Sequence, residues 1–328
     1  NDGSSDNNFD SVSDQTVSVT TTDDDAAGFT ITELSGTSVN ESGTTDTFTI
    51  VLDAQPTDDV VVAIASSDTG EATVNGPLTF TSGNWDTPQT VTVTGVDDDI
   101  IDGTVTSTLT IAVDDSNSDN DFDAVADQTV SAATTDDDVA GFTIAETDGS
   151  TSVAESGTTD TFTVVLDAEP ASDVVLTITS GDTGEATVTS ALTFTSANWD
   201  TAQTVTVTGT DDDVIDGTVA STITLSINDG SSDNNFDSVS DQTVSVTTTD
   251  DDVAGFTIAV TDSSTSVGES GTTDTFTGAL DAEPASDVVL TITSSDTGEA
   301  TVTSTLTFTS ANWDTPQTVT VTGVDDDI

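Results

Sequence analysis

The chain has 328 residues, of which 62 are Asp or Glu and none is Lys, Arg or His, so its formal charge is −62. A chain without cationic side chains cannot displace counterions from phosphates or adhere to an anionic bilayer, which excludes nucleic-acid binding and attachment to a membrane surface. The absence of Cys, His, Lys, Arg and Tyr removes most catalytic bases and nucleophiles, so we expect no enzyme and predict cations as partners.

Apolar and polar residues alternate along the first third of the chain, as is typical of β-strands. In chain order, the alternating stretches are 29–31, 47–52, 78–80, 89–94 and 108–113. Residues 60–64 form a continuous apolar run, which predicts a strand in the middle of a sandwich. No segment has helical periodicity, and no apolar run approaches the roughly 20 residues of a membrane helix. Low hydrophobicity with high charge is also typical of disordered chains, but this patterning favours a folded one.

The sequence repeats itself with a period of about 114 residues, at which Trp85, Trp199 and Trp313 recur. Residues 1–25 recur without change at 228–252. This period is far longer than the 20–50 residues of solenoid repeats and is typical of one β-sandwich domain with seven or eight strands. We therefore predict an all-β chain of tandem immunoglobulin-like antiparallel β-sandwiches, about 114 residues per repeat.

The period divides the chain into four predicted parts. Residues 1–25 are expected to supply the C-terminal strand or strands of a preceding repeat, and residues 28–138 and 141–252 two whole β-sandwich repeats. Residues 255–328 are expected to form an incomplete repeat that lacks its last strands. We expect the sequence to be part of a longer array.

Carboxylates gather at predicted strand ends, in loops that strand counting places at one pole of each sandwich. In the first whole repeat they are Glu41, Asp68, Asp97, Asp98, Asp99, Asp102, Asp136, Asp137 and Asp138. In the second they are Glu155, Asp182, Asp211, Asp212, Asp213, Asp216, Asp250, Asp251 and Asp252. In the incomplete repeat they are Glu269, Asp296, Asp325, Asp326 and Asp327. Hard oxygen ligands in excess, without nitrogen or sulfur, select Ca²⁺, so each group predicts a calcium site.

These motifs resemble the Calx-β repeats of sodium–calcium exchangers and of giant bacterial surface proteins. The resemblance rests on Val39-Asn40-Glu41 and its two later copies, on the loop carboxylate Asp68, on the acidic loop 97–102 and on the closing Asp run 136–138. It implies an immunoglobulin-like fold and a Ca²⁺ cluster near the junction with the following domain. The chain departs from the family in lacking basic residues and in its Asn/Asp-rich loop 114–123.

Each acidic feature also has a structural interpretation. The Asp runs could be solvated linkers of an acidic protein, and residues 228–237 could form a plain turn or a calcium loop. Trp85, Trp199 and Trp313 could stack on a sugar, although packing against the core is favoured. A carboxylate pair could act as in a glycosidase, but nothing sets one carboxylate apart from its neighbours.

The sequence therefore predicts a structural function: a calcium-stiffened stalk or spacer of a secreted or cell-surface bacterial adhesin, biofilm-matrix protein or filament. Its expected partners are calcium ions, neighbouring repeats of the same chain and other copies in a filament. One alternative is a self-assembling filament or surface-layer subunit whose open sandwich edges are completed by another chain's strand. A carbohydrate-binding module is the second alternative.

Overall fold

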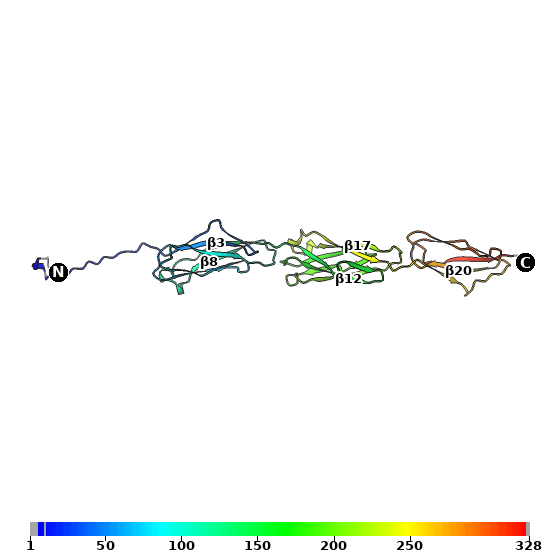
Figure 1. The fold of residues 1–328 in the computed structure, drawn as a ribbon, viewed down its shortest axis with the longest axis horizontal. Helices are drawn as coiled ribbons and strands as arrows, with labels where there is room; N and C mark the ends of the chain where they lie inside the picture. The colour runs from blue at the N-terminus through cyan, green and yellow to red at the C-terminus, as the bar shows by residue number, and fades with distance from the viewer. Residues whose placement is uncertain (1–5, 10, 326–328) are drawn as a thin grey trace. The chain divides into compact units, whose positions relative to one another are not determined.

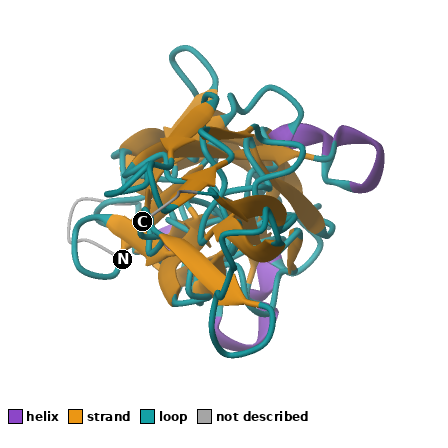
Figure 2. Ribbon diagram, turned by 90° about the vertical axis from the view of Figure 1, so that its right-hand side faces the viewer, coloured by secondary structure: helices purple, strands orange, loops and turns teal. Residues whose placement is uncertain are grey.

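The computed structural model describes residues 6–9 and 11–325 and is built from β-strands and five three-residue 3-10 helices (Figures 1 and 2). The chain divides into two compact units: residues 1–98 with 103–137, and residues 99–102 with 138–328. The first unit contains the first whole repeat, and the second contains the second and third repeats. No membrane-spanning helix occurs in the described part of the chain.

The first repeat contains nine strands in two sheets. They are β1 (Phe29–Thr32), β2 (Thr37–Asn40), β3 (Thr45–Leu52), β4 (Val60–Ser66), β5 (Ala72–Val74), β6 (Leu78–Phe80), β7 (Gln89–Gly95), β8 (Thr104–Val113) and β9 (Gln128–Thr135), with 3-10 helices η2 (Asp115–Asn117) and η3 (Asn120–Phe122); η1 (Asn7–Phe9) precedes the repeat. The sheet orders are β1-β3-β7-β5 and β2-β9-β8-β4-β6. All pairs are antiparallel except β2 with β9, which is parallel.

The second repeat has the same topology. Its elements are β10 (Phe142–Glu146), β11 (Thr151–Ala154), β12 (Thr159–Leu166), β13 (Val174–Ser180), β14 (Ala186–Val188), β15 (Ala191–Phe194), β16 (Gln203–Gly209), β17 (Val219–Ile227), η4 (Asp229–Ser231), η5 (Asn234–Phe236) and β18 (Gln242–Thr249). The sheet orders are β10-β12-β16-β14 and β11-β18-β17-β13-β15, and β11 pairs with β18 in parallel. The expected fold class of tandem β-sandwiches is confirmed. The expected seven or eight strands become nine, because three-residue strands such as β5 are too short to show alternation.

The alternating residues form the cores as expected. Phe48, Ile50 and Leu52 are at most 3% exposed and belong to one hydrophobic cluster. The prediction of a strand in the middle of the sandwich at residues 60–64 is confirmed, because β4 lies inside its sheet; within it only Val60 and Val62 are buried, while Ala63 is exposed. Each sheet packs one face on the core and leaves the other in solvent, so even an interior strand buries alternate residues.

The Asn/Asp-rich loops after β8 and β17 fold as turns anchored by one buried carboxylate each. Asp233 is 6% exposed and accepts hydrogen bonds from the backbone N–H groups of Ser172 and Asn235 at 2.8 and 3.0 Å. These bonds within the protein support the turn interpretation of residues 228–237. Trp199 packs against the core of the second repeat, which supports its packing interpretation.

The third repeat contains β19 (Phe256–Val260), β20 (Thr273–Leu280), β21 (Val288–Thr291), β22 (Ala300–Val302), β23 (Thr305–Phe308) and β24 (Gln317–Gly323). They form a sheet of order β19-β20-β24-β22 and the pair β21-β23. Residues 265–268, which align with β11, form no strand, and they have no parallel strand partner of the kind that β18 gives β11 within the described residues. Residues 15–22, which have the sequence of β18, form no strand.

Candidate metal centre

The acidic end of the second repeat is assembled by the ends of four strands. Glu155 follows β11, Glu185 precedes β14, Asp212 follows β16, and Asp250 and Asp252 follow β18. Because β11 and β18 run parallel, their C-terminal ends lie side by side, and the Glu155 N–H donates to the Thr249 carbonyl at 3.1 Å. The antiparallel pairing of β14 with β16 brings the start of one beside the end of the other.

Gly209 at the end of β16 allows the two sheets to approach at this edge. A Cβ atom on Gly209 would lie 2.0 Å from the carbonyl oxygen of Ala154, which a side chain cannot tolerate. Only glycine therefore permits β16 to pass this close to the end of β11, and the close approach brings the loop with Asp212 next to Glu155.

The carboxylates form two groups that share Glu155. One consists of Glu155, Glu185 and Asp212, and the other of Glu155, Asp250 and Asp252, with one oxygen from each member within 4.8 Å of the others. Two ligands of one Ca²⁺ at about 2.3–2.6 Å can lie up to about 5 Å apart, so either group has the spacing of an oxygen site. Glu155 stands where it can contribute to both.

Glu155 is fully buried and Glu185 is 6% exposed. Both side-chain oxygens of Glu155, Oε2 of Glu185 and Oδ2 of Asp252 accept no hydrogen bond of normal geometry within the described residues. The backbone N–H of Asp251 is close enough to favour the charged form of Glu155 slightly. A buried carboxylate without partners must either take up a proton or be neutralised by a cation.

The pKa values agree with this constraint. Burial, reinforced by the charges of Asp212, Asp250 and Asp216, raises the pKa of Glu155 to about 7. Burial is also the largest cause of the raised pKa values of Glu185, Asp216 and Asp252. The pKa of Asp250 is lowered instead, because its carboxylate accepts hydrogen bonds from the N–H groups of Gly217 and Asp252 at 2.8 and 2.7 Å.

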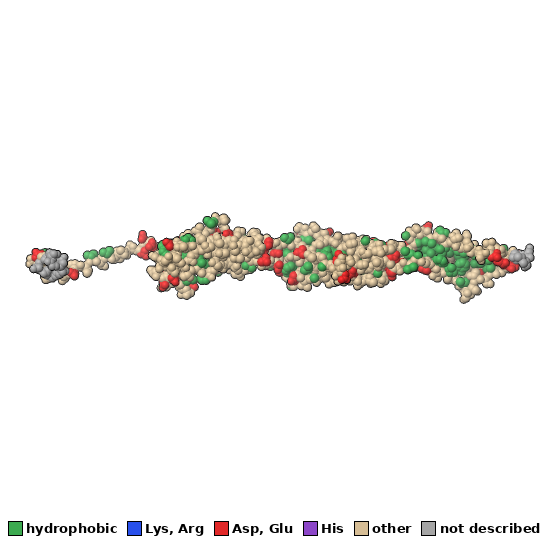
Figure 3. All heavy atoms as spheres, viewed as in Figure 1, with side chains coloured by type: hydrophobic (Ala, Val, Ile, Leu, Met, Phe, Trp, Pro, Cys, Tyr) green, Lys and Arg blue, Asp and Glu red, His purple; other side chains and the backbone are tan. Residues whose placement is uncertain are grey.

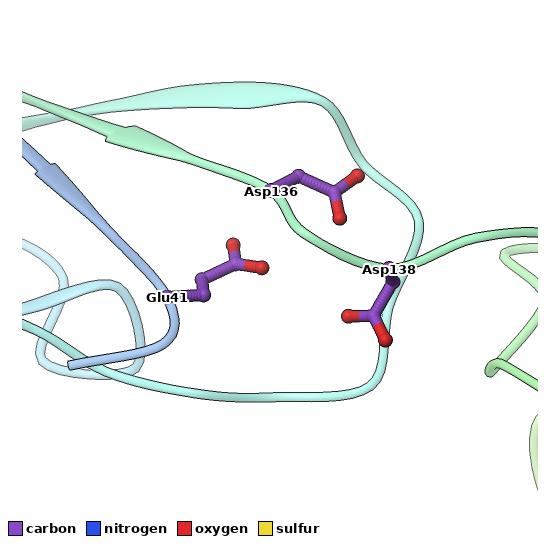
Figure 4. Close-up of side chains that lie close together, drawn as sticks. All are labelled: Glu41, Asp136 and Asp138. Carbon is purple, nitrogen blue, oxygen red and sulfur yellow. The ribbon is translucent and has the colours of Figure 1, made fainter.

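The first repeat holds a corresponding group. Glu41 and Glu71 are 1% and 6% exposed, and their carboxylate oxygens approach within 4.8 Å. Asp136 lies within the same distance of Glu41, and the two side chains project into the same space at the end of their strands (Figure 4). Asp136 also accepts a hydrogen bond from the Gly103 N–H at 2.9 Å. Asp102 and Asp138 belong to the second unit.

Of the carboxylates predicted in the second repeat, Glu155, Asp212, Asp250 and Asp252 are brought together, and Asp182 and Asp216 lie near enough to act on Glu185 electrostatically. Several predicted residues are exposed and join neither group: Asp211, Asp213 and Asp251 in this repeat, and Asp68, Asp97, Asp99 and Asp137 in the first. Asp98 is half-buried and also joins no group. Asp182 and Asp68 each accept the N–H of the glycine two residues later.

The third repeat forms no such group among its described residues. Glu269, Asp296 and Asp325 are exposed, and Asp326 and Asp327 lie outside the described residues. In the described part of the chain no strand precedes Glu269, and no counterpart of β18 follows β24.

The sequence prediction missed Glu185 and its counterpart Glu71. The signal was present, because Thr-Gly-Glu-Ala-Thr recurs at Glu71, Glu185 and Glu299 with the period of the repeat. This glutamate precedes a three-residue strand that alternation does not reveal, so its place at the acidic end was not evident.

No family model matches the chain, and no curated protein matches it. Similar solved structures include calcium binding domain CBD12 of CALX1.1, which is 16% identical over 58% of this chain and 77% of that chain, with a TM-score of 0.26. Domains 4–9 of the surface layer protein SbsC are 15% identical over 85% of this chain and 38% of that chain, with a TM-score of 0.29. An E-to-A variant of titin domains I67–I69 is 10% identical over 93% of this chain and 88% of that chain, with a TM-score of 0.28. At such low values the likeness is confined to the fold and bears on no further argument.

Proposed function

We propose that the acidic end of each whole repeat binds Ca²⁺ and that the chain is a calcium-stiffened structural array. The observation that carries this proposal is the buried carboxylate of Glu155, whose oxygens have no hydrogen-bond partner of normal geometry and are shared by two carboxylate groups. With no Lys, Arg or His in the sequence, only an external cation or protons can neutralise it. The all-oxygen donor set favours calcium over transition metals.

Residues that follow Asp212 of this site contact the third repeat just after β20, which suggests how calcium would stiffen the chain. Asp212 belongs to the site, and the next residues form a parallel bridge in which Val214 pairs with Glu283. The Glu283 N–H donates to the Asp213 carbonyl at 2.6 Å. An ion held by Asp212 would therefore order the backbone that binds the third repeat.

This function fits a spacer or stalk of a secreted or cell-surface bacterial protein, such as an adhesin or biofilm-matrix component. The tandem repeats provide length. Extracellular modules are served by weak calcium sites because calcium is abundant outside the cell. A spacer of this kind needs no loops that bind a target molecule, unlike the tip of an adhesin.

Calorimetric titration of the full chain with Ca²⁺ tests the proposal. Glu155→Gln keeps the shape of the side chain but removes its charge, so we expect it to abolish calcium binding by the second repeat and leave that of the first. Asp148→Asn is the matched control, because Asp148 is exposed and lies outside both groups. Unchanged stoichiometry and affinity in Glu155→Gln would refute the site. Small-angle scattering with and without chelator tests the stiffening, which predicts a larger maximum dimension with calcium.

A further inference from the structure

The acidic loop of the first repeat contains two apolar residues that a metal site does not require. Ile100 and Ile101 stand between Asp99 and Asp102, in the loop that joins β7 to β8. Acidic side chains gather at the ends of the repeats (Figure 3), which is a solvated environment that does not favour isoleucine. Both isoleucines are nevertheless half-buried, so another part of the chain covers them.

The second repeat provides this cover. Residues 99–102 belong by packing to the compact unit that contains the second repeat, although by sequence they lie within the first. The side chain of Ile101 packs against the core cluster of the second repeat, which includes Phe142 and Leu166. Because removal of apolar area from water is favourable, this contact stabilises the second repeat.

Hydrogen bonds fix the position of the loop on the second repeat. Ile100 forms a parallel bridge with Glu169, and the Glu169 N–H donates to the Asp99 carbonyl at 2.7 Å. The side-chain amide of Asn235 donates to the Ile101 carbonyl, also at 2.7 Å. Glu169 follows β12 and Asn235 lies in η5, so two separate segments of the second repeat bind the same short loop.

The same contact recurs 114 residues later along the chain. Val214 takes the place of Ile100 and forms a parallel bridge with Glu283 of the third repeat, whose N–H donates to the Asp213 carbonyl at 2.6 Å. The Ile215 N–H donates to the Glu283 carbonyl at 3.4 Å. Because the contact occurs twice with different side chains at its first position, it is a property of the repeat and not of one residue pair.

We propose that residues 99–102 are a docking element through which the first repeat stabilises the second. The partner surface is formed by Glu169, Asn235 and the core residues that contact Ile101. The loop belongs to one repeat by sequence and to the next by packing, so the dependence has a direction: the second repeat requires Ile101 and the first does not. In repeat arrays, interfaces between neighbours add to the stability of each repeat, and this loop provides such an interface.

Urea unfolding of the full chain, followed by one tryptophan at a time, tests the proposal. Trp199 reports on the second repeat when Trp85 and Trp313 are replaced by Phe, and Trp85 reports on the first when the other two are replaced. We expect Ile101→Ser to lower the urea midpoint of the second repeat and to leave that of the first unchanged. Measurement at pH 5 in calcium-free buffer makes the result independent of the proposed calcium site.

Val96→Ser is the matched control, because Val96 lies in the same loop and is half-buried but belongs to the unit of the first repeat. It should leave the midpoint of the second repeat unchanged. Asn235→Asp removes the donor to the Ile101 carbonyl and should lower this midpoint, whereas Asn234→Asp adds the same charge at the neighbouring exposed position and should not. The proposal would be overturned if Ile101→Ser lowered the midpoint of the first repeat more than that of the second, or changed neither.

Discussion

Because the carboxylate of Glu155 is buried, we predict that the stability of the second repeat depends on pH. In calcium-free buffer the second repeat should be less stable at pH 8 than at pH 5. The pKa of Glu155 is raised from 4.5 to about 7 in the folded chain, so between these values the folded state holds a proton that the unfolded state has released. Stability is therefore fully present below pH 4.5 and is lost as pH rises through about 7.

The size of the effect follows from the same values. At about 1.4 kcal/mol per pKa unit, the rise from 4.5 to about 7 corresponds to about 3 kcal/mol of unfolding free energy. The raised pKa values of Glu185, Asp216 and Asp252 have the same sign and add to the loss. Glu155→Gln imitates the protonated side chain, so it should remove about 3 kcal/mol of this loss in calcium-free buffer.

The fluorescence of Trp199 can report on the second repeat alone, since it packs against that core and each repeat has one tryptophan. In a chain with Trp85→Phe and Trp313→Phe, urea unfolding would be followed at pH 5 and pH 8. Calcium should restore stability at pH 8 in the parent chain and in Asp148→Asn, but much less in Glu155→Gln. A parent chain that is equally stable at both pH values without calcium would refute the reasoning.

Three further predictions use the single tryptophan of each repeat as the reporter of its urea unfolding. Phe236→Ala should destabilise the second repeat by about 3–5 kcal/mol because Phe236 is fully buried, while Phe9→Ala, in the identical segment where the ring is 67% exposed, should change nothing. The first repeat should lose stability as pH falls from 3.8 towards 2, because hydrogen bonds from backbone N–H groups and from the Thr57 hydroxyl lower the pKa of Asp119 to about 2. Asp119→Asn should flatten this pH dependence. A variant with the same pH profile as the parent chain would contradict the prediction. Gly278→Val should stabilise the third repeat by about 1–3 kcal/mol, since an added Cβ meets only a leucine methyl at 3.4 Å. Gly209→Ala should instead destabilise the second repeat, because its Cβ would overlap a backbone carbonyl oxygen. Destabilisation by Gly278→Val or stabilisation by Gly209→Ala would contradict the packing described at these glycines.

Much of the fold could be predicted from the sequence because its signals are local. Alternation placed Phe48, Ile50 and Leu52 on one face, and the 114-residue period indicated one sandwich per repeat. The repeated Val-x-Glu motif and the Asp runs marked four of the five carboxylates that form the two groups of the second repeat. Pattern and composition are sufficient for such features because each depends on residues close together in the chain.

The selection of ligands required the tertiary structure. Asp211, Asp212 and Asp213 are indistinguishable in sequence, but only Asp212 joins Glu155. Its neighbours Asp211 and Asp213 are exposed, which only the folded loop reveals. Glu185 comes to the site through the pairing of β14 with β16, a contact between segments distant in sequence.

The identical segments 1–25 and 228–252 show most clearly which features the sequence determines and which the tertiary structure decides. Residues 242–249 form β18 between β11 and β17, whereas residues 15–22, with the same sequence, form no strand. The sequence determines that this segment is amphipathic and able to form a strand. Whether it becomes one is decided by neighbouring strands, because a strand's backbone hydrogen bonds and buried face both depend on partners elsewhere in the chain.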